Sequence, residues 1–196
     1  MFRKENALIG DVLQYRSSGD AIGGFIAFFS NLGRLFRQGG KHVHSAIYVG
    51  NGQVIHSHLK VDLQFWLEGS RKTGVHRARI NPEEYELIDI YRLPHCLNQI
   101  QRKKLVTEAK KYLGKKYDLA AFPSAFFRSV LARIFGWSNF RKGKPIFNDP
   151  DRWFCSELVS HVYYESLHIK LNPYVYQTSQ VPSDLSSKRS ILKQVS

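Results

Sequence analysis

Cys155 stands at the start of a segment that could present a nucleophile. Behind it, apolar residues recur at helical spacing, at Leu158, Val159, Val162, Tyr163 and Leu167. The N-terminus of a helix lowers the pKa of a thiol and favours the thiolate, which is the nucleophilic form. We therefore predict an activated cysteine at the first turn of an amphipathic helix. A buried cysteine that packs as a small apolar side chain would show the same pattern.

Four histidines lie far upstream, in two short segments with the pattern of strands. His42–Gly50 is followed by Asn51-Gly52, a two-residue hairpin signal, and then by Gln53–His58. Side chains alternate along a strand, so antiparallel pairing across this turn can set a histidine of each strand side by side. One imidazole could deprotonate the thiol while the other orients the first. Metal ligation and a structural role are the alternatives, although the chain lacks the closely spaced cysteines of structural zinc sites.

Five separated segments resemble the permuted papain-like cysteine hydrolases of the NlpC type, which include YiiX-like amidases and lecithin-retinol acyltransferases. In chain order they are Gly10–Leu13, His44–Gly50, Gly114–Asp118, Cys155–Val159 and the weaker Val181–Leu185. The resemblance implies an α+β, circularly permuted papain-like fold, with a small antiparallel sheet or partial barrel packed with helices. Because it spans most of the chain, we expect residues 1–196 to form a single hydrolase domain.

The same resemblance implies roles for individual residues. Cys155 is the expected nucleophile, His44 the expected general base, and His56 the expected orienter of His44. The amidase branch usually carries a glutamate where this chain has His56, whereas a His-His-Cys set with a twelve-residue step from His44 to His56 is similar to the acyltransferase branch. Tyr117 lies in a segment that the resemblance brings toward the pocket. It is either a donor to the oxyanion or a core tyrosine with a bonded hydroxyl.

The expected reaction is acyl transfer through a thioester on Cys155, with backbone N–H groups at the helix start as oxyanion donors. The substrate would be an amide or an ester, in a peptide or a lipid, and neither a cofactor nor a metal is expected. His42 and His58 are second choices for the histidine roles. A noncatalytic module that holds lipid or nucleic acid on a basic surface is the alternative function.

Composition excludes a disordered chain, because 43% of the 196 residues are hydrophobic and 13% are aromatic. The formal net charge is +13, and residues 102–144 carry twelve Lys or Arg against two acidic residues, a balance of +10. This excess implies an anionic partner. Within it, the aromatic stretch Leu119–Trp137, interrupted by Arg128 and Arg133, suits an anionic membrane surface. The sequence has no motif for specific nucleic-acid binding.

Two apolar stretches, Ala21–Arg37 and Leu119–Trp137, are too short or too interrupted to predict membrane spans, and core helices are the alternative for at least the first. The start of the chain lacks an apolar run behind its charges, so we expect no signal peptide. With two cysteines and no disulfide framework, the expected location is cytoplasmic, peripheral at a membrane if the basic stretch docks there. Cys96 is expected to be a bystander.

The remaining elements follow from periodicity and capping signals. Besides the hairpin, we expect strands at Val12–Tyr15, Gly74–Arg79 and Glu86–Leu93. Helices are expected at residues 20–37 and from about Asn98 to Leu113, the second with a capping box at its start. Residues 141–150 should form a loop that leads to Cys155, and residues 183–196 a polar tail.

Overall fold

The computed structural model describes residues 2–16, 42–58, 73–118, 149, 151–173, 182–188 and 190–195. Its strands are β1 (Val12–Arg16), β2 (His42–Gly50), β3 (Gln53–His58), β4 (Gly74–Arg79), β5 (Ile88–Arg92), β6 (Lys116–Tyr117), β7 (Arg152–Trp153) and β8 (Lys193–Gln194). Its helices are α3 (Gln99–Lys110), α5 (Cys155–Leu167) and α6 (Pro182–Leu185), with short 3-10 helices η1 (Lys4–Asn6) and η3 (Pro82–Leu87).

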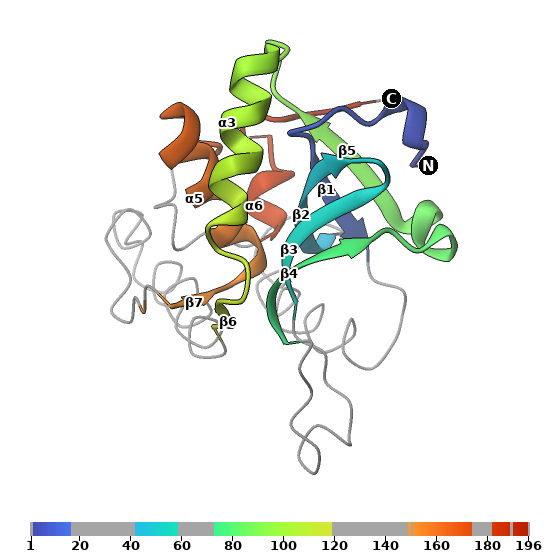
Figure 1. Ribbon diagram of the computed structural model, residues 1–196. Coiled ribbons are helices and arrows are strands. Elements are labelled where there is room, and N and C mark those ends of the chain that lie inside the picture. Colours follow the sequence, from blue (N-terminus) through green and yellow to red (C-terminus); the bar gives the residue numbers. More distant parts are fainter. Residues whose placement is uncertain are drawn as a thin grey trace, which may run out of the picture.

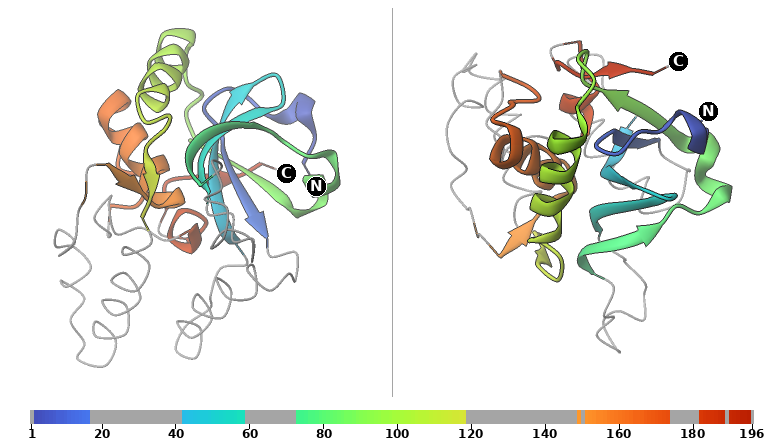
Figure 2. Two further views of the ribbon diagram at one scale, coloured as in Figure 1. Left: turned by 60° about the horizontal axis from the view of Figure 1, so that its bottom comes forward. Right: turned by 45° about the horizontal axis from the view of Figure 1, so that its top comes forward.

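Six of the strands form one antiparallel sheet in the order β4-β3-β2-β1-β5-β8, and β6 and β7 form a separate parallel pair. Figure 1 shows α3, α5 and α6 on one side of this sheet, and both views in Figure 2 keep the helices and the strands apart in this way. The predicted hairpin turn joins β2 to β3. Asn51 and Gly52 both have positive φ, 54° and 69°, as a tight two-residue turn between antiparallel strands requires.

Two hydrophobic clusters lie on the two sides of the sheet. On the helix side, Ile47 and Ile55 pack with Leu158, Val159 and other residues of α5. The residues that alternate with these along each strand, such as Ala46 in β2 and Val54 in β3, belong to the second cluster. Its other members include Phe2, Leu13, Tyr48, Ile88 and Ile90. Because strand side chains alternate, this division also decides where polar residues point. Ser45 and Ser57 face α5, and the neighbouring histidines of β2 and β3 face the other side.

Helix α3 begins as predicted. The side chain of Asn98 accepts the backbone N–H of Gln101, and the side chain of Gln101 accepts the backbone N–H of Asn98, both at 2.9 Å. The helix ends at Lys110, before the predicted Leu113, because residues 111–114 form a turn that Gly114 closes with a φ of 86°. Leu105 and Ala109 lie on the buried face of the helix.

The prediction of a polar C-terminal tail was wrong. Residues 182–185 form α6, and β8 pairs with β5, with Gln194 opposite Tyr91. Leu185 and Leu192 are buried, and Ile191 and Val195 pack against the two clusters, so scattered apolar residues attach this segment to the core. The strand predicted from Glu86 starts at Ile88, because η3 occupies residues 82–87 after an Asn81 cap.

Several predictions concern segments outside the described residues: the apolar stretch 21–37, the basic aromatic stretch 119–137, and the loop 141–148. They stay predictions. Among the helices that the structure describes, none is both long enough and apolar enough to cross a bilayer.

Candidate functional site

Cys155 is the first residue of α5, as predicted, and its side chain is 1% exposed. Phe154 precedes the helix with extended backbone angles and has no side-chain acceptor of its own. The cap therefore comes from Glu157, whose Oε2 accepts the Phe154 N–H at 3.2 Å. The apolar face of α5 then fixes the helix on the sheet, so the thiol is held at a defined place.

Strands β2 and β3 separate at the end near Cys155. Their backbone pairing joins Ile47–Gly50 to Gln53–Ile55; beyond it, β2 continues paired only with β1 and β3 only with β4. The Ser45 N–H, a strand donor that would otherwise reach a neighbouring carbonyl, donates to Sγ of Cys155. Ser57 Oγ donates to the carbonyl of Trp153 at 2.5 Å. The start of α5 is thus held between the two separated strand ends.

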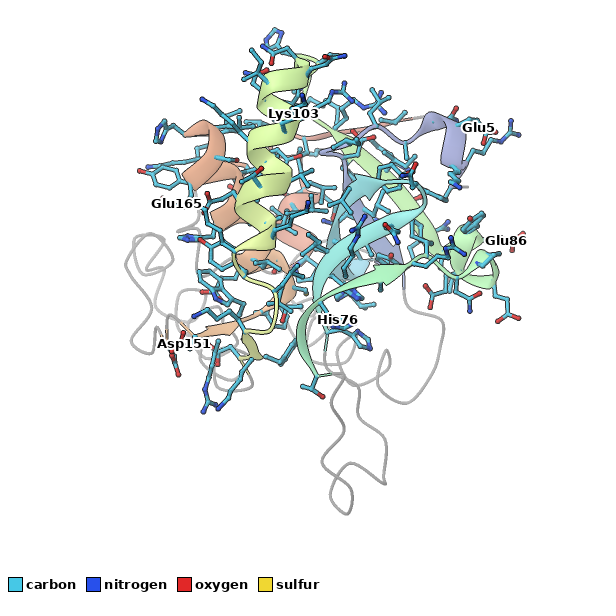
Figure 3. All side chains as sticks on the ribbon, in the orientation of Figure 1. Glu5, His76, Glu86, Lys103, Asp151 and Glu165 are labelled. Atoms are coloured by element: carbon cyan, nitrogen blue, oxygen red, sulfur yellow. The ribbon has the colours of Figure 1, made fainter. Side chains whose placement is uncertain are left out.

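Four histidines, which we call the imidazole cluster, lie at the same strand ends on the side of the sheet away from α5. Nε2 of His44 lies 2.8 Å from Nδ1 of His56, and Nε2 of His56 lies 3.1 Å from Nε2 of His76 on β4. His58 stacks on His56, with ring centroids 5.4 Å apart. Figure 3 labels His76 on its strand. The structure therefore brings together His44 and His56, the pair predicted from the sequence.

The thiol and the imidazole cluster approach one gap from two sides. Sγ of Cys155 accepts the N–H of Ser45, the residue next to His44, so it lies at the level of the sheet between the separated strands. Across the same gap between β2 and β3, the side chains of His44 and His56 contact each other. No hydrogen bond links Sγ to an imidazole within the described residues.

Burial disfavours the charged forms of Cys155, His44 and His56. Burial raises the pKa of the Cys155 thiol to about 12, although N–H groups of Ser45, Ser156 and Cys155 itself oppose this rise. Burial, helped by the neighbouring imidazoles, holds the pKa of His44 well below its ordinary value and lowers that of His56 to about 3. The prediction of a resting thiolate was therefore wrong, because desolvation outweighs the donors at the helix start.

The two second-choice histidines lie in different places. His58 belongs to the imidazole cluster, with its ring 5.6 Å from that of His44. His42 lies outside it, because a shift in the β1–β2 register pairs His42 with Arg16 of β1, and its side chain reaches across β1 to β5. There its Nε2 lies 2.8 Å from Oδ2 of Asp89. His42 is thus part of a carboxylate pair and takes no part in the cluster.

Tyr117 lies beside the nucleophile candidate. It packs with Phe154 and Cys155 in a small buried cluster, its ring centroid 5.8 Å from that of Phe154. Burial, followed by the proximity of Cys155 and Asp118, raises its pKa well above the ordinary value, so its hydroxyl stays a donor at neutral pH. The structure thus places Tyr117 in the same buried cluster as Cys155, and both the donor role and the core role stay predictions.

Three members of the imidazole cluster could hold a metal ion. One ring nitrogen each from His44, His56 and His58 lie within 4.8 Å of one another. Imidazole nitrogen suits zinc, copper, nickel and iron. Two nitrogens bound to one tetrahedral zinc at 2.0–2.1 Å would lie about 3.3 Å apart, whereas the facing nitrogens of His44 and His56 are 2.8 Å apart, at hydrogen-bond distance. The donor set fits a metal once these two rings move apart by about 0.5 Å.

Two functional candidates were missed from the sequence. His76 was not considered, although the alternation of β4 places it on the face of His56; the segment between β3 and β4 has no turn signal that would set their register. Glu157 was noted only as part of the helix. It is buried near Asp118. Burial, followed by the charge of Asp118, raises its pKa to about 8, although the hydrogen bond from the Phe154 N–H lowers it. Spacing alone could not reveal that this carboxyl is buried.

Comparisons with known proteins support the fold. No protein-family model matches the sequence, and no curated protein matches it. The crystal structure of the metalloprotein YiiX from Escherichia coli O157:H7 is similar to this structure, with a TM-score of 0.52 and 18% sequence identity over 97% of each chain. At this identity the similarity shows the fold alone, a mixed α/β fold like that of YiiX. The α+β prediction is confirmed at this level, and the permuted papain-like topology stays a prediction.

Proposed function

We propose that the protein is a cysteine-dependent hydrolase or acyltransferase that cleaves an amide or ester through a thioester on Cys155. The observation that carries this proposal is the gap between β2 and β3. On one side it receives a thiol at the start of a helix, and on the other it is bridged by His44 and His56. A nucleophile, a base and an orienting group are the parts that covalent acyl transfer needs.

The proposed reaction starts from a neutral thiol and a neutral imidazole. As Sγ of Cys155 attacks the carbonyl carbon, its proton passes to His44, and His56 holds the His44 ring in place. The leaving amine or alcohol takes that proton as the carbonyl re-forms, which leaves an acyl-thioester. Water, or an acceptor alcohol or amine, then attacks the thioester; His44 takes its proton and returns it to the departing Sγ, which restores the thiol. The sulfur–imidazole hydrogen bond is expected to form in the substrate complex, since such contacts are often long without substrate.

The oxyanion of this reaction would be stabilised at the start of α5. The backbone N–H groups of Cys155 and Ser156 already point toward Sγ, and developing negative charge is favoured at a helix N-terminus. Tyr117 is the proposed side-chain donor, because its hydroxyl stays protonated beside the thiol. Tyr117→Phe keeps the ring packing and removes only the hydroxyl. We expect it to lower the acylation rate by roughly tenfold to a thousandfold.

The test is acylation of the full-length chain by a panel of activated amide, ester and lipid-ester probes, followed by intact mass. Wild type should gain one acyl group on Cys155, Cys155→Ala none, and His44→Ala should acylate at least ~100-fold more slowly. Cys96→Ser is the matched control, because Cys96 is exposed and lies apart from the site, and it should acylate like wild type. Acylation that persists without Cys155, or that ignores His44→Ala, would exclude the proposal.

Metal binding by the imidazole cluster is the second candidate function. It is favoured by the three nitrogens within 4.8 Å, and the similar YiiX structure is that of a metalloprotein. His44, His56 and His58 would hold the ion. An ion on the His44 nitrogen that faces His56 would leave the proton of that ring on its other nitrogen, so the ring could not act as a base. His58→Ala separates the two functions, because it removes a ligand and leaves the His44–His56 pair. If the cluster is a metal site, zinc titration by calorimetry should show tight binding to wild type that is lost in His58→Ala. If the cluster serves only acyl transfer, His58→Ala should acylate at the rate of wild type.

The proposal extends to an anionic membrane surface as a partner, bound by the basic stretch of residues 102–144 and presenting the substrate. Support comes from charge: the described part of the stretch exposes Lys103, Lys104 and Lys110 on α3. Vesicles of anionic lipid should bind the protein at low salt, neutral vesicles should not, and 0.5 M salt should release it. Replacing both Arg128 and Arg133 by glutamate should weaken binding and leave acylation of Cys155 unchanged. Failure on anionic vesicles would favour a soluble amide.

A further inference from the structure

His76 is the member of the imidazole cluster that lies farthest from the thiol along the chain of contacts. It lies directly opposite His56 in the pairing of β3 with β4, and the two Nε2 atoms are 3.1 Å apart. Its other nitrogen, Nδ1, lies 3.0 Å from the carbonyl oxygen of Gly74. The contacts form a continuous series from Gly74 through His76 and His56 to His44.

The carbonyl at one end gives this series a single direction. A carbonyl oxygen only accepts hydrogen bonds, so Nδ1 of His76 must carry its proton. In a neutral ring the Nε2 of His76 is then an acceptor, and Nε2 of His56 must donate to it. Nδ1 of His56 is therefore the acceptor for the N–H at Nε2 of His44. The lone pair of His44 is therefore on Nδ1.

The Gly74 carbonyl is itself held by the backbone. Val75 N–H donates to the Lys115 carbonyl at 2.8 Å, and Gly114 N–H donates to the Val75 carbonyl at 2.9 Å. Gly74 has a φ of 118°, and a Cβ there would lie 2.3 Å from the Lys115 oxygen, so only glycine allows this close crossing. The orientation of the carbonyl is thus set by two backbone hydrogen bonds next to it and does not depend on a mobile side chain.

We propose that His76 is a positioning residue that, anchored on the Gly74 carbonyl, holds His56 and His44 in the tautomers that leave Nδ1 of His44 free to take the thiol proton. The inference rests on the proposed function of His44 as the base. A neutral imidazole has two tautomers, and the hydrogen bonds of the series from Gly74 to His44 choose between them. A base in the wrong tautomer presents an N–H to the thiol and cannot accept its proton.

The test uses the full chain with ¹⁵N-labelled histidine, in a chelator that keeps metal away. Nitrogen NMR reports directly which nitrogen of each ring carries the proton. Wild type should show His44 protonated at Nε2, His56 at Nε2 and His76 at Nδ1. His76→Leu removes the acceptor and should leave His44 in a mixture of both tautomers. His76→Gln restores an acceptor oxygen and should restore the tautomer of wild type.

Acylation of Cys155 by the activated ester probe is the second readout. His76→Leu should slow it on the order of 10–100-fold, and His76→Gln should recover most of that loss. His161→Gln is the matched control, a histidine of α5 that packs on Trp153 and Tyr112 outside the cluster. Among the described residues β4 lies at the edge of the sheet, so substitutions there should be tolerated. His76→Val is the alternative if His76→Leu does not fold.

The two readouts separate this inference from the proposed function. If His44 keeps a single Nε2–H tautomer in both His76→Leu and His76→Val, the positioning role of His76 is wrong, whatever the acylation rate. If His44→Ala acylates as fast as wild type, the proposed function is wrong, and with it the use of the tautomer, even where the NMR result stands. Altered tautomers together with slow acylation and rescue by His76→Gln is the result that we expect.

Discussion

Glu157 provides a test of how the start of α5 is built, because its carboxyl is buried and its charge is disfavoured. Burial raises its pKa from 4.5 to about 8; the Phe154 N–H opposes this rise, and Asp118 adds to it. Between these two pH values the unfolded chain has released the proton and the folded protein still holds it. Stability from this group is therefore complete below about pH 4.5 and is lost as the pH rises to about 8.

Glu157→Gln removes this dependence and keeps an oxygen that can accept the Phe154 N–H. Each pKa unit corresponds to about 1.36 kcal/mol. As the pH rises from 4.5 to 8, the free energy of unfolding of the variant should therefore increase relative to that of wild type by up to about 5 kcal/mol. The value is an upper bound, because water can reach a buried carboxylate through local opening.

The measurement is urea unfolding of both proteins at intervals from pH 5 to 9, followed by circular dichroism. Glu165→Gln is the matched control. Glu165 lies on the exposed side of the same helix (Figure 3), and its substitution removes the same formal charge. A stability difference between Glu157→Gln and wild type that stays flat over this range would refute the reasoning, because it would mean that Glu157 ionises as readily in the folded protein as in the unfolded chain.

Two further predictions concern the thiol and the strand crossing. In a Cys96→Ser background, iodoacetamide at pH 7.5 should alkylate Cys155 at least a thousandfold more slowly in the folded protein than in urea. The reason is that a pKa of about 12 leaves only about 3 thiolates in 100,000. An alkylation rate of the folded protein within tenfold of the rate in urea would contradict the burial argument. Gly74→Ala should destabilise the protein by more than about 2 kcal/mol in urea unfolding, through its positive φ and the contact with the Lys115 oxygen. Gly114→Ala, with positive φ and open space around the added methyl, is the control and should cost less; equal losses would show that the contact adds nothing.

Much of the local structure could be predicted from the sequence because its causes are local. The Asn51-Gly52 turn, the capping box at Asn98 and the helix start at Cys155 each depend on residues within a few positions of one another. Strand alternation also placed His44 and His56 on one face of the sheet. Their contact was not fixed by the hairpin, because the register that pairs Ile47 with Ile55, if continued, would set His44 opposite His58.

What needed the tertiary structure was everything set by distant segments. The loss of pairing between β2 and β3, the insertion of Cys155 at that gap and the position of His76 depend on the packing of α5 and the register of β4, and no nearby residue encodes them. Burial also reversed the local prediction for the thiol. A helix N-terminus acts on Cys155 through adjacent N–H groups, whereas desolvation comes from the whole surrounding fold, and at 1% exposure the larger effect is the one that sequence position does not reveal.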